Sequence, residues 1–268
     1  MIQCLTNDDW KTNSHDILEM HRLRSRVFKG RLDWDVTSDN GLEWDRFDTL
    51  DPIYIVANDD AGRVAGTWRM LPTTGPYMLR DVFPQLMDGL PPPASPRIWE
   101  GSRFAVDCDY DGSKAGLAAL SRTTAEIFCA VVELSMALGA EELVTVYDAR
   151  IARLLPRLGV VPTWRGTPVR IGSTIAMAGR FDISDDVLAT IRERTGLAEP
   201  VLPARLPAHA ALAPAPMFPA APAPVQLRGA SIGTASAQPI ETPIPANGQP
   251  RFQETTRMAE PAPQRRAA

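Results

Sequence analysis

The pattern of apolar and polar positions changes its period several times along the first 197 residues. Apolar residues three, four or seven positions apart predict a helix, most clearly from Leu117 to Leu138, where Gly139 follows as a stop. Helices are also predicted over residues 14–29, stopped by Gly30, from Asp148 as N-cap to Gly159, and from Ser184 as N-cap to Arg194.

Strands are predicted where β-branched and aromatic residues gather. Residues 53–58 and 63–71 form a predicted hairpin, because the Asp-Asp-Ala-Gly between them favours a tight turn. Further strands are predicted over residues 1–6, 97–106, 142–147, 160–164 and 169–181. Hairpins give antiparallel neighbours and helical crossovers give parallel ones, so the order predicts an α/β fold, a single three-layer α-β-α domain with a mixed sheet.

The composition changes at about Ala198, where proline and alanine become dominant. Fourteen of the 25 prolines lie between Pro200 and Pro263, whereas all six tryptophans precede this segment. Such a segment lacks the apolar mass to offset the entropy of ordering, and its prolines favour extended backbone. We therefore predict a folded domain over residues 1–197 and a disordered Pro/Ala-rich tail over residues 198–268.

Charge and cysteine content exclude several classes of protein. The net charge of −4 argues against nonspecific binding to nucleic acid. No signal-peptide pattern begins the chain and no apolar run of about 18 residues occurs, so neither export nor a membrane contact is expected. Three cysteines without CxxC spacing and three scattered histidines predict neither disulfides nor a metal site, which fits a cytoplasmic protein.

Charged residues stand inside predicted helices and strands, where charge without a partner is rare. Arg24 lies in the first helix on the same face as Phe28, and Arg69 lies inside a strand. The natural partners of these arginines and of Arg103 are the carboxylates of Asp45, Asp48 and Glu100. A structural salt-bridge cluster is the alternative to a catalytic site here.

Glu100 and Arg103 are three residues apart in a predicted strand, which places them on opposite faces if the strand is regular. A bulge brings both side chains to one side, and we predict it at Gly101. Arg103 then joins the other charged residues.

Together these residues resemble the pattern of acyl-homoserine-lactone synthases, the autoinducer synthases. The matching positions are Arg24, Phe28, Trp34, Glu43, Asp45, Asp48, Arg69, Phe83, Glu100 and Arg103. The resemblance spans about residues 1–185 and implies a GNAT-like acyltransferase fold, with a sheet splayed to admit an acyl chain. The Pro/Ala tail departs from the usual length of the family.

The resemblance implies an enzyme of quorum sensing that transfers an acyl group from acyl carrier protein, or from acyl-CoA, to the amine of S-adenosylmethionine. Closure of the lactone then releases methylthioadenosine, so S-adenosylmethionine is a substrate and no cofactor is implied. An α-amino group has a pKa of about 7.7 to 8.0 and must lose its proton before it attacks. Glu100 is the implied base, with Arg103 and Asp45 as further catalytic residues.

The remaining positions are implied to bind substrate or to shape its pocket. Aromatic faces suit adenine and the sulfonium cation, and a guanidinium suits a carboxylate. These residues are Arg24, Phe28, Trp34, Asp48, Arg69, Phe83, Ser102, Phe104 and Thr145. A threonine at position 145 goes with 3-oxo acyl chains in the family, while acyl length and C3 oxidation stay open.

A separate basic signal follows Asp148. Arg150, Arg153 and Arg157 occupy positions i, i+3 and i+7 of one predicted helix, in a domain that is otherwise acidic. Acyl carrier proteins are strongly acidic, so this stripe is predicted to dock one. The alternative is a solvated helix face.

Two other functions stay open. A GNAT-type N-acetyltransferase using acetyl-CoA on another amine needs a pyrophosphate-binding loop, for which Gly112 and Gly116 are too far apart. A noncatalytic binding protein has the pocket without the base, and the presence of Glu100 argues against it. The oligomeric state is not fixed by the sequence.

Overall fold

The computed structural model describes residues 1–107, 121–203 and 206. The chain divides into two units, Met1–Met217 and Phe218–Ala268, and every described residue belongs to the first. The predicted helix start at Leu117 and most of the predicted tail lie outside the described residues.

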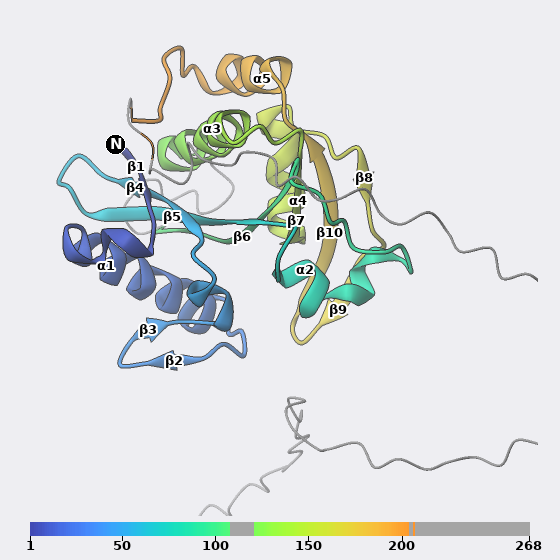
Figure 1. Ribbon diagram of the computed structural model, residues 1–268, viewed down its shortest axis with the longest axis horizontal. Coiled ribbons are helices and arrows are strands. Elements are labelled where there is room, and N and C mark those ends of the chain that lie inside the picture. Colours follow the sequence, from blue (N-terminus) through green and yellow to red (C-terminus); the bar gives the residue numbers. More distant parts are fainter. Residues whose placement is uncertain (108–120, 204–205, 207–268) are drawn as a thin grey trace, which may run out of the picture. The chain divides into compact units, whose positions relative to one another are not determined.

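A mixed sheet runs through the first unit (Figure 1). Its strand order is β1-β4-β5-β6-β7-β10-β8, and β9 pairs with β10. The strands are β1 (Ile2–Leu5), β4 (Ile53–Asn58), β5 (Val64–Pro72), β6 (Ile98–Val106), β7 (Glu142–Asp148), β8 (Trp164–Arg165), β9 (Val169–Ile171) and β10 (Thr174–Asp182). The predicted hairpin is the antiparallel β4–β5 pair.

The parallel neighbours β6 and β7 open the sheet. They stay in register from Ile98 opposite Glu142 to Gly101 opposite Thr145. Beyond that point β6 continues its pairing with β5, and β7 with β10. We call the opening between residues 102–106 of β6 and 146–148 of β7 the fork. The mixed, splayed sheet predicted from the sequence is confirmed.

Helices cover both faces of the sheet, which confirms the three-layer fold (Figure 1). One layer holds α3 (Arg122–Ala137), α4 (Ala149–Leu154) and α5 (Asp185–Thr195), and the other holds α1 (Ser14–Ser25) and α2 (Met78–Asp81). Short 3-10 and π turns and a two-stranded ribbon complete it: η1 (Asn7–Lys11), η2 (Arg26–Arg31), β2 (Ser38–Asp39), β3 (Leu42–Glu43), η3 (Arg46–Thr49), η4 (Pro84–Met87) and η6 (Leu155–Leu158).

Side chains that alternate along the strands belong to separate cores on the two faces of the sheet. Trp68 and Met70 of β5 join the core under α3, whereas Tyr54 and Val56 of β4 join the core under α1. The face to which a strand residue points therefore decides which core, and which part of the site, it belongs to.

Four predicted elements differ from the structure. The strand predicted over residues 160–164 begins only at Trp164, because β8 is Trp164–Arg165. The first helix is not stopped by Gly30, because a π turn continues through Arg31. The strand predicted over residues 169–181 is the β9–β10 hairpin, whose turn holds Gly172 at φ +57°. The helix predicted after Asp148 is α-helical only through Leu154, because Pro156 lacks the N–H that an α-helical bond needs.

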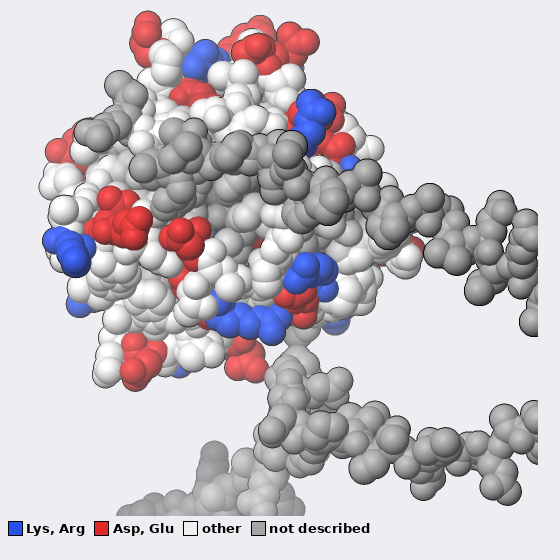
Figure 2. Space-filling model, in the orientation of Figure 1, with Lys and Arg blue, Asp and Glu red and all other residues white. Residues whose placement is uncertain are grey.

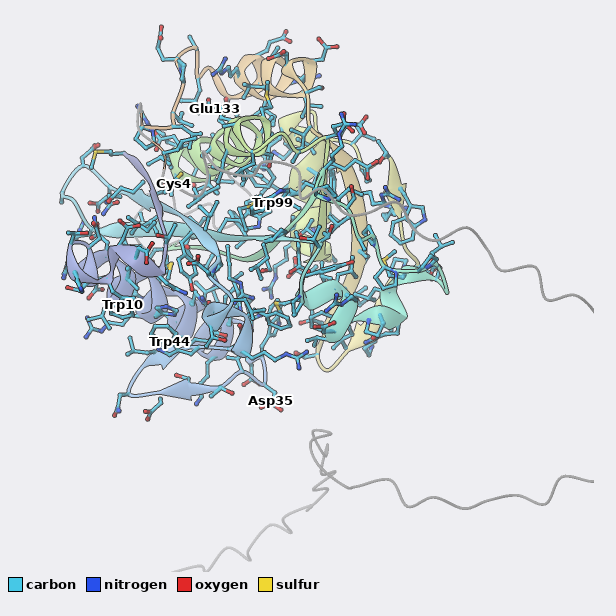
Figure 3. The ribbon with its side chains drawn as sticks, in the orientation of Figure 1. Cys4, Trp10, Asp35, Trp44, Trp99 and Glu133 are labelled. Carbon is cyan, nitrogen blue, oxygen red and sulfur yellow. The ribbon has the colours of Figure 1, made fainter. Side chains whose placement is uncertain are left out.

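The segment after α5 packs back onto α3, where Figure 3 labels Glu133. The Glu133 carboxylate accepts hydrogen bonds from the backbone N–H groups of Val201 and Leu202 at 3.0 to 3.2 Å and from Arg192 at 2.9 Å. Packing therefore continues past residue 197, the predicted end of the folded domain. Within the described residues, no helix has the length and apolar character needed to cross a membrane.

Candidate active site

Six charged side chains meet on the α1 side of the sheet, and we call them the ion cluster. Three arginines come from α1, β5 and β6, and three carboxylates come from the segment 43–48. The members are Arg24, Arg69, Arg103, Glu43, Asp45 and Asp48. Equal numbers of each sign make the cluster neutral, which reduces the cost of burying it.

Asp48 joins two arginines of the ion cluster. Its carboxylate accepts hydrogen bonds from Arg24 at 2.8 and 2.9 Å, from Arg69 at 2.9 Å and from the Tyr54 hydroxyl at 2.9 Å. Burial favours the protonated carboxyl, but Arg24 and Arg69 outweigh it and hold the pKa of Asp48 well below its usual range. Asp48 is therefore ionised at neutral pH.

Asp45 and Glu43 connect Arg103 to the rest of the cluster. Asp45 pairs with Arg69 at 2.6 Å and with Arg103 at 2.8 Å. Glu43 pairs with Arg24 at 2.5 Å and with Arg103 at 3.0 Å. Arg103 is thus fixed by two carboxylates from one short segment.

The ion cluster reaches the surface at one side. The side chains of Arg103 and Asp45 are 10% and 17% exposed, whereas the other four are at most 1% exposed. Arg103 and Asp45 are therefore the members that a substrate can touch, and the enclosed members hold them in place.

A bulge in β6 brings Arg103 to the cluster. Its backbone has φ +57°, in the left-handed region that residues other than glycine rarely adopt. The register with β5 shifts just after Ser102, which lies opposite Arg69. The predicted bulge therefore exists, but after Ser102 and not at Gly101. Ser102 also faces the cluster, and its hydroxyl accepts a hydrogen bond from Arg69 at 3.1 Å.

A stacked aromatic pair lies next to Arg103. The ring centroids of Phe28 and Trp34 are 5.2 Å apart, and the Arg103 guanidinium carbon lies 5.4 Å from the Phe28 centroid. The indole N–H of Trp34 donates to the hydroxyl of Thr174 on β10 at 2.9 Å. One wall of the site therefore joins segments from opposite sides of the fork.

Glu100 lies on β6 but apart from the ion cluster. Its carboxylate is fully buried and accepts backbone hydrogen bonds at the start of α2, from Leu79 at 2.6 Å and Met78 at 2.9 Å. Burial raises its pKa to about 7, although these two bonds favour the ionised form. Within the described residues Glu100 forms no ion pair, so its predicted pairing with an arginine is wrong, and Arg103 pairs with Glu43 and Asp45.

The predicted substrate-binding residues do not all lie together. Phe104 points to the α3 side, with its ring 5.1 Å from that of Trp68. Thr145 lies opposite Gly101 at the base of the fork. Phe83 is the N-cap of η4 and packs beside α2. The ion cluster, the α3 side and the α2 region are thus three separate parts of the predicted site.

The predicted docking arginines Arg150, Arg153 and Arg157 are exposed. Arg157 lies in η6, so the three do not share one continuous α-helix as predicted. Among the described residues on the face shown in Figure 2, acidic and basic side chains are interleaved.

His21 supports Glu43 and was given no role from the sequence. Its Nδ1 lies 2.8 Å from the backbone oxygen of Glu43, and its ring stacks on Trp44 with centroids 3.4 Å apart. Trp44 in turn stacks on Trp10, and Figure 3 labels both tryptophans beside α1. Burial lowers the pKa of His21 to about 4, so the neutral ring donates from Nδ1 to the carbonyl. This role depends on packing between distant segments, which leaves no local sequence signal.

Known proteins resemble this chain in sequence and fold. Residues 9–191 match the family described as autoinducer synthase. The acyl-homoserine-lactone synthase of Agrobacterium fabrum is 41% identical over 180 residues, 67% of this chain and 85% of that protein. The crystal structure of the AHL synthase LasI has a TM-score of 0.64 and 34% identity, covering 72% of this chain and 94% of that one. A CoA-dependent acyl-homoserine lactone synthase, BjaI, solved with SAM and isopentyl-CoA, has a TM-score of 0.66 and 26% identity, covering 77% and 94%.

Proposed function

The chain belongs to the autoinducer synthase family and is an acyltransferase, and from this premise we propose the reaction that it catalyses. An acyl group passes from a thioester to the amine of S-adenosylmethionine, and a homoserine lactone then closes with release of methylthioadenosine. The observation that carries the proposal is the position of Arg103, the arginine of the ion cluster that reaches the surface, beside the stacked Phe28–Trp34 pair.

The surroundings of Arg103 match the charges of S-adenosylmethionine. The guanidinium pairs with the substrate carboxylate, while the faces of Phe28 and Trp34 receive the adenine and the sulfonium cation. The Asp45 side chain is 17% exposed, and its carboxylate accepts a hydrogen bond from the substrate ammonium group. Because two carboxylates already fix Arg103, little side-chain ordering is needed on binding. The related BjaI was solved with SAM, which supports S-adenosylmethionine as the substrate.

In the first step the deprotonated amine attacks the thioester carbonyl. A C–N bond forms, the C–S bond breaks, and the thiol leaves with the proton that the amine gives up. We assign Glu100 as the base that takes the ammonium proton of S-adenosylmethionine before the attack, since its pKa of about 7 suits proton transfer near neutral pH. It acts through a water molecule, because its carboxylate is enclosed by the start of α2.

In the second step the substrate carboxylate attacks the carbon that carries the sulfonium. A C–O bond forms, the C–S bond breaks, and neutral methylthioadenosine leaves. The leaving group is already activated, so orientation of the attacking carboxylate supplies most of the rate enhancement. Arg103 provides this orientation by holding the carboxylate.

The fork is the proposed entry for the acyl thioester, since it is the place where the sheet opens beside the site. We propose acyl carrier protein as the donor, docked by the exposed Arg150, Arg153 and Arg157, because complementary charge steers an acidic partner. Acyl-CoA is the alternative donor, which the BjaI complex with isopentyl-CoA supports.

The test is expression in a bacterium that makes no such signal, with mass spectrometry of the spent medium for the homoserine-lactone fragment ion. A series of acyl-homoserine lactones is expected, together with release of methylthioadenosine by the purified protein. Absence of both, across carrier-protein and CoA donors, contradicts the proposal and favours the acetyltransferase alternative, whose loop at residues 112–116 lies outside the described residues.

A further inference from the structure

A buried tryptophan at the base of the fork has an unused hydrogen-bond donor. Trp68 on β5 is 5% exposed, and its indole Nε1–H finds no acceptor among the described residues. A buried donor without a partner costs about 1–3 kcal/mol, so such groups need an explanation. Trp34, by contrast, gives its indole N–H to Thr174.

The indole nitrogen lies directly over Gly101. A Cβ added at Gly101 lies 2.6 Å from Nε1, so only glycine leaves the nitrogen uncovered at this point. Gly101 is the last residue of β6 in register with β7, and it lies opposite Thr145. The donor is therefore placed where the two strands begin to separate.

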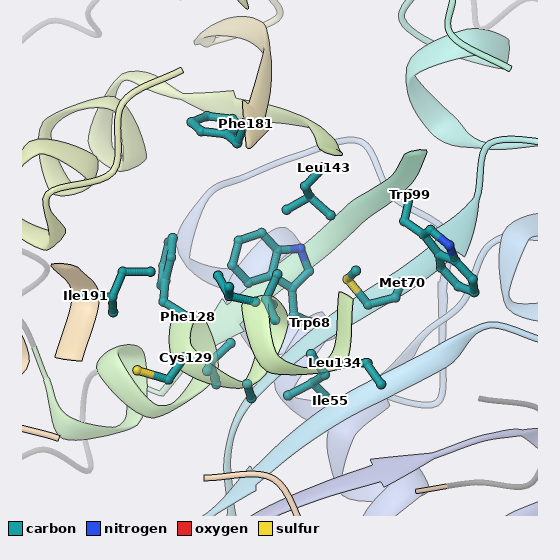
Figure 4. Close-up of a cluster of buried hydrophobic side chains, with 14 of the residues drawn as sticks. Ile55, Trp68, Met70, Trp99, Phe128, Cys129, Leu134, Leu143, Phe181 and Ile191 are labelled. Carbon is teal, nitrogen blue, oxygen red and sulfur yellow. The ribbon is translucent and has the colours of Figure 1, made fainter. Parts of the chain in front are cut away.

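The indole is otherwise enclosed by apolar groups (Figure 4). Its ring is 5.1 Å from that of Phe104 and 5.0 Å from that of Phe128, and Met70 and Leu143 belong to the same core. Thr145 shares a face of β7 with Leu143 by strand alternation. A lone N–H in an apolar cage suits an apolar ligand that carries one oxygen.

The two faces of the sheet decide which oxygen this is. Arg103 points to the α1 side, where the amine of S-adenosylmethionine and the reacting carbonyl must meet. Trp68 and Phe104 point to the opposite, α3 side. An oxygen that reaches Nε1 therefore lies beyond the thioester carbonyl, on the acyl chain itself.

We propose that the indole N–H of Trp68 donates a hydrogen bond to an oxygen on the third carbon of the acyl chain, so that Trp68 selects oxygenated over unsubstituted acyl donors. The inference rests on the proposed function. Selection follows because an unsubstituted chain leaves the buried donor without a partner, and a site built to hydrogen-bond a group discriminates against the analogue that lacks it.

The experiment compares the 3-oxooctanoyl and octanoyl thioesters of acyl carrier protein and of CoA, by kcat/KM for methylthioadenosine release. The wild type is expected to prefer the 3-oxo donor. Trp68→Phe removes the N–H and keeps an aromatic ring, and it is expected to lower kcat/KM for the 3-oxo donor about tenfold, which corresponds to about 1.4 kcal/mol. The octanoyl donor is expected to change less than about twofold.

Phe128→Leu is the matched control, because it disturbs the same apolar cage without removing a hydrogen-bond donor. It is expected to affect both acyl donors alike. If Trp68→Phe does not fold, benzothienylalanine at this position, with sulfur in place of the N–H, repeats the test at nearly constant volume.

Equal losses with both donors in Trp68→Phe, or a wild type that prefers octanoyl, overturn the inference and leave the proposed function intact. No lactone from any thioester overturns the proposed function and this inference with it.

Discussion

Replacing Glu100 by glutamine separates two roles of one carboxylate, support of α2 and proton transfer. Glutamine keeps one acceptor oxygen but presents an NH2 group to the second backbone donor, so the N–H of Met78 or of Leu79 loses its partner. An unsatisfied buried donor costs about 1–3 kcal/mol. In a folded unit of this size that loss lowers the melting temperature by about 2–4 °C per kcal/mol.

The same substitution has a stability effect that depends on pH. Burial raises the folded-state pKa of Glu100 from 4.5 to about 7, so its stabilising contribution is complete below pH 4.5 and is lost as the pH rises through 7. That shift corresponds to about 3 kcal/mol at 1.36 kcal/mol per pKa unit. Glutamine does not titrate, so urea unfolding at pH 5 and pH 8 should show the wild-type advantage shrinking at the higher pH. A difference that is constant with pH refutes this reasoning.

The catalytic effect is measured on the same protein. Glu100→Gln is expected to slow acylation about 10²- to 10⁴-fold, the usual contribution of a general base, while S-adenosylmethionine binding stays within about twofold. The rise of kcat/KM with pH near 7 disappears, and a rise near 8 from the substrate amine remains. The control is Glu193→Gln, an exposed glutamate on α5, which leaves both readouts unchanged. Turnover of Glu100→Gln within about threefold of wild type excludes Glu100 as the base.

Three further predictions concern the surroundings of the site. Asp48→Asn leaves two buried arginines undercompensated and should cost about 3–5 kcal/mol in urea unfolding; a loss below about 1 kcal/mol would show that the ion cluster is not needed for stability. His21 has its folded pKa lowered from 6.5 to about 4, so its contribution is present above pH 6.5 and is lost as the pH falls to 4. The stability difference between wild type and His21→Gln should shrink over that window, and a flat difference would contradict the buried neutral ring. Arg153→Glu with Arg157→Glu should raise KM for acyl carrier protein alone, and an equal rise with acyl-CoA would rule out the docking role.

Periodicity and local chemistry were enough to predict most of the fold. The hairpin, the N-caps at Asp148 and Ser184 and the three layers follow from patterns within short segments, and the structure confirms them. The helix break at Pro156 was missed, although proline carries the signal.

The site was predicted as a set of residues but not as a set of contacts. Glu43 and His21 act through partners far away in the sequence, and neither role has a local pattern. Strand alternation alone does not locate the bulge, because its position depends on how β6 pairs with β5. The unpaired indole of Trp68 is visible only once its neighbours are in place.

The left-handed backbone of Arg103 is a strain that the ion pairs of its guanidinium offset. A side chain in this conformation costs about 1–2 kcal/mol relative to glycine, which adopts it freely. Glycine at position 103 would relieve this strain but would leave Glu43 and Asp45 without the guanidinium, and the loss of a buried ion-pair partner, about 3–5 kcal/mol, exceeds the gain. Selection for heat tolerance alone would therefore retain arginine at position 103, because the same side chain that is proposed to hold the substrate also stabilises the folded domain.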